Sequence, residues 1–301
     1  AYTSYLPTLV QRERLIEGNT KLEVSRSLAQ ITGPSLGGVL TQLLTAPIAI
    51  IFDALSFLTS GLFLAFIRKT EPPPVPQSER RNIWVEIGEG LRVVWTNPVL
   101  RALVMAAATA NLFANMNGTV YVLYATRELL ISPAIIGLIY GIGSLGGLLG
   151  ALMAGRFVKW FGLGQTIVGA QVMAGVGALL IPLVGGQPMV VAILLTVAQT
   201  LWIFAVIIHD INALSLRQAI TPDRLLGRVG ATARFVAWGT MPLGALLGGA
   251  LGEMFGLRPT LMLAGLGVLL ASLWILLSPL RTLHEQPATT SHSALVASEV
   301  V

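Results

Sequence analysis

The sequence predicts an all-α membrane protein with eight bilayer-spanning helices. Three observations support this fold class: the composition, the length of the apolar stretches and the placement of the basic residues. Of the 301 residues, 54% are hydrophobic and only 11% are charged, and the mean hydropathy is +0.77. Soluble domains carry about 25% charged residues, and disordered chains are polar and rich in charge. The composition therefore excludes both of these classes.

Eight apolar stretches follow one another along the chain, each close to the roughly 20 residues that a helix needs to cross a bilayer. None alternates like a barrel strand, and backbone polar groups in lipid must be satisfied within the segment, so helices are expected. Asn97-Pro98 and Ser132-Pro133 each offer a capping side chain followed by proline at the first helical position. The predicted spans are 27–44, 47–67, 99–126, 133–155, 165–184, 188–209, 232–252 and 258–279.

The basic residues indicate the orientation of these spans. If the segment before the first span is cytoplasmic, all of the 19 basic residues except Arg127 and Arg258 fall on the cytoplasmic side, as expected for loops that stay in the cytoplasm. The net charge of +5 is thereby explained without nucleic acid, since no basic stripe with interleaved aromatic residues is present. We expect a multi-pass protein of the cell membrane with a cytoplasmic C-terminus.

A proline-rich, charged break at 68–82 divides the chain into two helical units. After it, Ile83, Ile87, Leu91 and Val94 recur at helical spacing, which predicts an amphipathic helix in the membrane interface. The expected domains are the end of an N-terminal bundle (1–67), a linker with this helix (68–98), a six-helix bundle (99–282) and a disordered tail (283–301).

An internal repeat relates the two units. The segment VQRERLIEGN at 10–19 is similar to ITPDRLLGRV at 220–229, and LGGVL at 36–40 is similar to LGGAL at 247–251. Pro34 and Pro242 correspond in the two copies. The second copy ends a six-span unit, whereas only two spans follow the first copy before the linker. The chain is therefore expected to hold the last eight of twelve helices.

The residues give no support for an enzyme. None of the three lysines follows a glycine, so a phosphate-binding Gly-Lys-Ser/Thr is absent, as is His-Glu-x-x-His. The chain also has no cysteine. We expect no catalytic residue, no metal and no cofactor. His209, the only histidine before the tail, stands at the predicted end of span 188–209 and is expected to be a helix-end or loop residue. Asp210 falls at the cytoplasmic edge, where we expect it to be solvated or paired with an arginine.

Polar residues inside the spans are the candidate substrate or proton pathway. Asp53 lies inside its span, where an acid needs a partner or water; a proton or substrate site and a tertiary latch both fit it. Asn111 and Asn115 share one face of span 99–126, and Asn117 and Tyr121 share another. These side chains either line a cavity or hold helices together.

Glycine and proline predict close packing and bending. Span 133–155 carries glycines at small-xxx-small spacings, which allow backbones to approach closely, as static packing or as sliding surfaces. Gly33, Pro34, Gly37 and Gly38 predict a bent helix with a flat face. Pro242 repeats this pattern in the second unit.

With these residues in view, the sequence resembles the major facilitator superfamily. The pattern GPSLGG at 33–38 is similar to a fifth-helix motif of its antiporters, and 81–101 and 215–229 resemble its enterobactin-exporter and macrolide-efflux branch. Gly155, Arg156 and Gly162 fall in a loop to which the resemblance assigns a gating role. Lys159 and Trp160 stand there in place of the family's Asp-Arg.

The resemblance implies a monomeric secondary transporter that exports a small molecule in exchange for protons by alternating access. Two other classes stay open: a membrane subunit driven by a separate ATPase, and a polytopic membrane enzyme.

Overall fold

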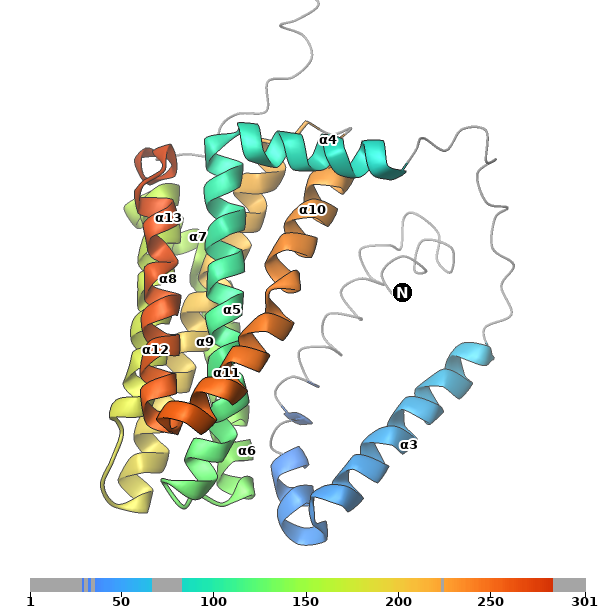
Figure 1. Ribbon diagram of the computed structural model, residues 1–301, viewed down its shortest axis with the longest axis vertical. Helices are drawn as coiled ribbons and strands as arrows, with labels where there is room; N and C mark the ends of the chain where they lie inside the picture. The colour runs from blue at the N-terminus through green and yellow to red at the C-terminus, as the bar shows by residue number, and fades with distance from the viewer. Residues whose placement is uncertain (1–28, 30–31, 34–35, 67–82, 223–224, 284–301) are drawn as a thin grey trace, which may run out of the picture.

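The computed structural model describes residues 29, 32–33, 36–66, 83–222 and 225–283, and the regular elements in these ranges are helices (Figure 1). A helical segment at 36–44 precedes the labelled helices. These are α3 (Ala46–Ala65), α4 (Ile83–Thr96), α5 (Pro98–Arg127), α6 (Pro133–Gly143), α7 (Leu145–Phe161), α8 (Leu163–Leu180), α9 (Pro188–Ala219), α10 (Leu226–Gly239), α11 (Met241–Phe255), α12 (Leu257–Leu270) and α13 (Ser272–Leu276), with 3-10 turns η3 (Ile181–Leu183) and η5 (Pro279–Thr282).

Six helical segments in the described ranges are long and apolar enough to cross a membrane. They confirm the six spans predicted between 99 and 279. An apolar helix at Pro47–Phe63, within α3, is shorter. The six segments are Pro98–Arg127, Pro133–Phe161, Leu163–Leu183, Pro188–Ala219, Leu226–Phe255 and Leu257–Leu276.

The two predicted capping residues start α5 and α6. The Asn97 side chain accepts hydrogen bonds from the backbone N–H groups of Val99 and Leu100, and Ser132 accepts one from Ile135. Each cap satisfies donors that a helix leaves unpaired at its first turn. Proline follows directly in both cases, at a position where its missing N–H costs nothing.

The six-span bundle is built around α5, α8 and α9. Helix α5 packs against α11 and α12, α12 packs against α8, and α9 packs against α6, α7 and α8. Glycines make these contacts possible. A Cβ atom at Gly150 would lie 2.6 Å from the Phe204 carbonyl oxygen, and one at Gly248 would lie 2.7 Å from that of Met116. The predicted close packing of helix backbones is thereby confirmed.

Three of the six spans are interrupted, which the sequence did not predict for spans 133–155 and 258–279; in the latter, α12 and α13 meet at Ala271. Helices α6 and α7 meet at Ser144, and α10 and α11 meet at Thr240, two residues before Pro242. Proline removes a helix hydrogen bond, so Pro242 accounts for the break between α10 and α11. The bend expected around Pro242 is confirmed, whereas Pro34 lies outside the described residues.

Helix α9 is longer than predicted. It has 32 residues, or about 48 Å at 1.5 Å per residue, and it ends at Ala219 rather than near 209. His209 is therefore an interior helix residue, and the expectation that it stands at a helix end is wrong. Asp210 also lies within α9 and its side chain is exposed. Hydropathy marks where the apolar stretch ends, but a helix can continue into water beyond it.

Helix α4 packs against α10 of the bundle on the side that carries Gly90. A Cβ atom at Gly90 would lie 2.9 Å from the Arg228 carbonyl oxygen on α10, and Glu89 forms an ion pair with the Arg228 side chain. Val94, one turn further, is buried in an apolar cluster with Val229. Other large apolar side chains of α4 stay exposed: Val85, Ile87, Leu91 and Trp95.

The described basic residues gather at one end of the bundle. The start of α5, the end of α7 and the starts of α8 and α10 all lie at the same end of the bundle as α4 (Figure 1), and we call this end of the bundle the basic end. Arg127 and Arg258, at the end of α5 and the start of α12, lie at the opposite end. The alternation of helix directions matches the predicted one. The basic end holds Arg92, Arg101, Arg156, Lys159, Arg217, Arg228, Arg234 and Arg281.

Candidate functional site

Asn111 and Asn115 are partly buried on α5 and both are hydrogen-bonded. Asn111 Nδ2 donates to the Ala237 carbonyl oxygen at 3.1 Å, across to α10, and Asn115 Nδ2 donates to the Asn111 carbonyl oxygen at 2.9 Å. The Thr240 hydroxyl, at the break between α10 and α11, also lies 2.9 Å from the Ala237 oxygen. The structure therefore gives Asn111 a structural partner at the helix break.

Asn117 and Tyr121 differ sharply from that pair. Each side chain is 1% exposed, and the amide nitrogen and oxygen of Asn117 and the hydroxyl of Tyr121 have no hydrogen-bond partner among the described residues. They lie one turn apart on the same face of α5. Leaving such a group buried and unpaired costs about 1–3 kcal/mol, so the fold carries three polar atoms that it does not use for its own cohesion.

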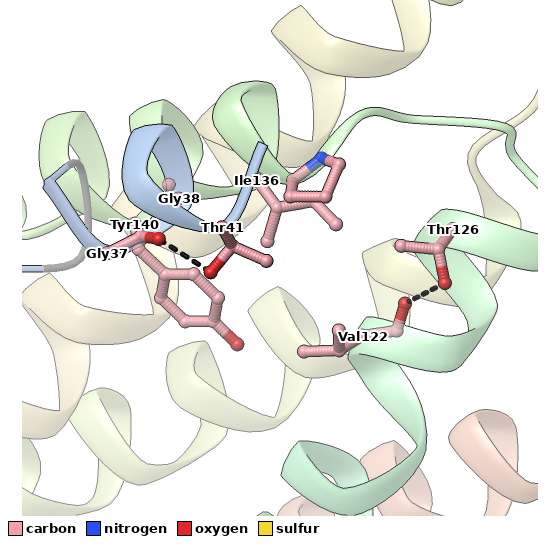
Figure 2. A pocket seen from close by; sticks show the side chains of 9 residues that line it. Gly37, Gly38, Thr41, Val122, Thr126, Ile136 and Tyr140 are labelled. Carbon is pink, nitrogen blue, oxygen red and sulfur yellow. Dashed lines mark hydrogen bonds between the residues drawn. The ribbon is translucent and has the colours of Figure 1, made fainter. Parts of the chain in front are cut away.

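Tyr140 of α6 contacts Tyr121 and also lines a pocket. Its ring centroid is 5.5 Å from that of Tyr121 in an edge-on arrangement. The same side chain lines a pocket of about 410 Å³, together with residues of segment 36–44, α5 and α6 (Figure 2). The other lining residues are Gly37, Gly38, Thr41, Val122, Thr126, Pro133, Ile136 and Gly137. The pocket is at the end of the bundle opposite the basic end.

Segment 36–44 meets α6 at this pocket. A Cβ atom at Gly38 would lie 2.5 Å from the Pro133 carbonyl oxygen and 2.9 Å from Gly137 Cα. The Gln42 side-chain oxygen accepts a hydrogen bond of 3.1 Å from the Ala134 backbone N–H, at the start of α6. Gly38 therefore lets the backbones touch, as its place in the predicted flat face suggested, while Gly33 and Gly37 have open space around them.

Asp53 lies apart from the polar residues of α5. It is on the exposed surface of α3, and its carboxylate makes no hydrogen bond or ion pair with another described residue. The structure thus brings together Asn117 and Tyr121, places Asn111 and Asn115 nearer the break of α10 and α11, and leaves Asp53 outside both groups.

Of the residues predicted for the loop after α7, only Gly162 lies in the turn between α7 and α8, and the loop prediction is wrong for Gly155 and Arg156, which are within α7. Gly155 and Arg156 are exposed near the end of α7. Gly162 separates α7 from α8 with φ 83° and ψ 161°, a conformation that is almost confined to glycine. Gly256 makes the same turn between α11 and α12, with φ 90° and ψ 163°.

His209 is a buried ionisable residue whose position the sequence did not reveal. It is 6% exposed, and its Nδ1 lies 3.4 Å from the Ile167 carbonyl oxygen on α8. Ile167 is one turn into α8 from the basic end, so His209 is held within the bundle. The burial of His209 could have been inferred only from the knowledge that the helix continues through 210–219. Hydropathy does not show that continuation.

A bundle of six apolar spans with the basic residues gathered at one end is the architecture of a multi-pass membrane protein. Over residues 1–301 the chain matches the family model described as transmembrane secretion effector, MFS_3. The chain belongs to this family of the major facilitator superfamily, which confirms the resemblance seen in the sequence.

Curated relatives are exporters. The chain is 28% identical over 262 residues to the multidrug efflux pump Tap of Mycolicibacterium fortuitum, covering 85% of this chain and 61% of the pump. It is 27% identical over 290 residues to the enterobactin exporter EntS of Salmonella typhi, covering 93% of this chain and 66% of the exporter. The chain thus spans less than two thirds of the length of these relatives.

Solved structures show the same fold at lower sequence identity. A bacterial homologue of the iron transporter ferroportin, in its inward-facing state, matches with a TM-score of 0.68 and 17% identity, covering 91% of this chain and 65% of that one. A bacterial metal transporter matches with a TM-score of 0.66 and 16% identity, covering 89% and 67%.

Proposed function

We propose that this protein is a secondary active exporter that moves a small molecule, such as a drug, a siderophore or another metabolite, out of the cell in exchange for protons. The proposal is supported most by the unpaired polar atoms of Asn117 and Tyr121 in the interior of a transporter-family bundle. Buried polar groups in membrane helices are costly and mark functional positions. The exporter relatives support the outward direction.

The mechanism we propose is alternating access, in which the two bundles rock about a central site. The contacts of Gly38 and Gln42 with α6 close the bundles at the end opposite the basic end. Basic loops stay in the cytoplasm, so this closed end would face outward. In this state the site would be reached from the cytoplasm, which is the loading state of an exporter.

Proton coupling requires an ionisable side chain in the membrane. Asp53, on α3, is the candidate that the sequence indicates, and the buried His209 of α9 is the one that the structure adds. Gly33, Pro34, Gly37 and Pro242 are proposed to bend the moving helices. Gly162, together with Gly155 and Arg156 near the end of α7, is proposed to act at the cytoplasmic gate. We propose that the transporter works as a monomer in the cell membrane.

The test is efflux from cells that lack their major pumps and express the protein from its own gene at its natural length. We expect lower accumulation of at least one compound in a panel of dyes and antibiotics, and loss of that effect when an uncoupler collapses the proton gradient. Efflux that survives the uncoupler but stops on ATP depletion would instead indicate an ATP-driven partner. Asp53→Asn tests coupling, because unchanged uncoupler-sensitive efflux would remove Asp53 from that role.

A further inference from the structure

The hydrogen-bonding groups around Tyr140 define what kind of ligand could bind there. The amide of Asn117 offers both donors and an acceptor, and the hydroxyl of Tyr121 offers one donor and two lone pairs. All of this capacity is unused within the described residues. A group that completes it must itself both donate and accept hydrogen bonds.

The surroundings of the pair exclude a charged ligand group. Tyr121 lies in an apolar cluster with side chains such as Ile139, Leu195 and Leu261, and the lining of the neighbouring pocket contains no charged residue. An ion transferred to such a place without a counter-ion loses its hydration at great cost. An uncharged polar group loses only its hydrogen bonds to water, and Asn117 and Tyr121 can replace these hydrogen bonds.

The pocket beyond Tyr140 has matching chemistry. The hydroxyl of Thr41 donates to the Gly37 carbonyl oxygen at 2.8 Å, and that of Thr126 donates to Val122 at 2.8 Å, as the dashed lines in Figure 2 show. Because each hydroxyl has a single proton, both threonines keep only lone pairs for a ligand. The pocket is otherwise apolar, so it suits the body of an amphipathic, uncharged molecule.

Helix α6 provides a way to connect the two spaces. It has only 11 residues and ends at the Ser144 break, where the Ser144 N–H donates to the Tyr140 carbonyl oxygen at 2.9 Å. Tyr140 is thus in the last turn before the break, and its ring extends from α6 toward the space between Thr41 and Val122 (Figure 2). A tilt of α6 about this break would move the ring and would expose Tyr121 to the pocket.

We infer that Asn117 and Tyr121 form a polar subsite that Tyr140 separates from the pocket, and that this subsite takes an uncharged hydroxyl or carboxamide group of the transported molecule when α6 tilts. The inference rests on the proposed function, since it assigns a substrate class to the same transporter. It also makes a binding prediction that can be measured without transport.

The test uses the protein at its natural length in lipid nanodiscs, labelled with 3-fluorotyrosine and observed by fluorine NMR. Acetamide serves as the uncharged probe and tetramethylammonium as the charged one. We expect acetamide to shift the Tyr121 and Tyr140 signals saturably and tetramethylammonium to leave them in place. The signals are assigned with Tyr121→Phe and Tyr140→Phe.

Two variants make the test specific. Asn117→Leu should weaken acetamide binding by roughly three- to tenfold, the change expected from losing a neutral hydrogen bond. Gln171→Leu is the matched control, because Gln171 is a buried amide of the same bundle that already donates to the Val268 carbonyl oxygen at 3.0 Å; it should leave the affinity unchanged. Tyr140→Ala, which removes the ring, should strengthen acetamide binding.

The subsite would be refuted by an acetamide titration that does not saturate, by an equal response to tetramethylammonium, or by equal effects of the two leucine variants. An ordered water that permanently satisfies Asn117 would give the first of these results. Saturable acetamide binding without uncoupler-sensitive efflux would reject the proposed exporter and keep the subsite. Efflux without acetamide binding would reject only the subsite.

Discussion

The unpaired hydroxyl of Tyr121 predicts an unusual gain of stability on its removal. Tyr121→Phe deletes one buried oxygen that has no partner among the described residues and keeps the ring that packs against Tyr140. A buried unpaired hydroxyl costs about 1–3 kcal/mol. Part of the gain is lost with the contacts of the oxygen atom, so we expect the variant to be about 1 kcal/mol more stable.

Tyr124→Phe provides the matched comparison. Tyr124 is also 1% exposed and also on α5, but its hydroxyl lies 3.5 Å from the Val184 carbonyl oxygen, a long and weak hydrogen bond. Its removal should be neutral or destabilising by up to about 1 kcal/mol. Thermal unfolding in one detergent, followed by a fluorescent dye, measures both variants. A Tyr121→Phe variant no more stable than Tyr124→Phe would show that the Tyr121 hydroxyl has a partner, and the argument for an unused polar group would fail.

Three further variants test the turn at Gly162, the contact between segment 36–44 and α6, and the ion pair between α4 and α10. Gly162→Ala forces a side chain into a conformation nearly confined to glycine and should lower the stability by about 1–3 kcal/mol, measured by the same unfolding assay. Gly38→Leu places atoms where the α6 backbone lies and should slow efflux at normal expression, whereas Gly61→Leu, on α3 with open space around it, should not; equal efflux by the two variants would argue against a gate at this contact. Arg228→Gln removes the ion pair between Arg228 and the partly buried Glu89. A double-mutant cycle with Glu89→Gln should give a coupling of about 0.2–1 kcal/mol, and zero coupling would show that this pair does not hold α4 against α10.

The span positions could be predicted because they depend on local features. Asn97 and Ser132 mark helix starts through their own side chains, and apolar length marks a crossing. The break at Ser144 could not be predicted in the same way, because serine is tolerated in membrane helices and the flanking residues are as apolar as the rest of the span. The continuation of α9 beyond His209 was not predicted. Hydropathy indicates which residues lie in lipid and which in water, but it does not show where the backbone hydrogen bonds of a helix end.

The packing of α4 shows a second limit. Its apolar period predicted a helix that lies in the membrane interface, and the helix is present. The period alone could not show that Gly90 and Val94 face α10, since that contact depends on a residue with no side chain and on a partner more than 130 residues away. A small residue inside an amphipathic pattern indicates such a contact only when the facing helix is known.

The buried amides show why the candidate site needed the structure. Asn111, Asn117 and Gln171 are similar residues in similar apolar spans, and the sequence allows each to hold helices together or to bind a ligand. Asn111 and Gln171 donate to carbonyl oxygens of other helices, so folding already uses them. Asn117 has no such partner. A buried polar group without a hydrogen-bond partner lowers the stability of a membrane protein. In a transporter, hydrogen bonds to a bound substrate can offset this loss. The unused hydrogen-bonding capacity, rather than the residue type, is therefore what separates Asn117 and Tyr121 from the amides that join helices.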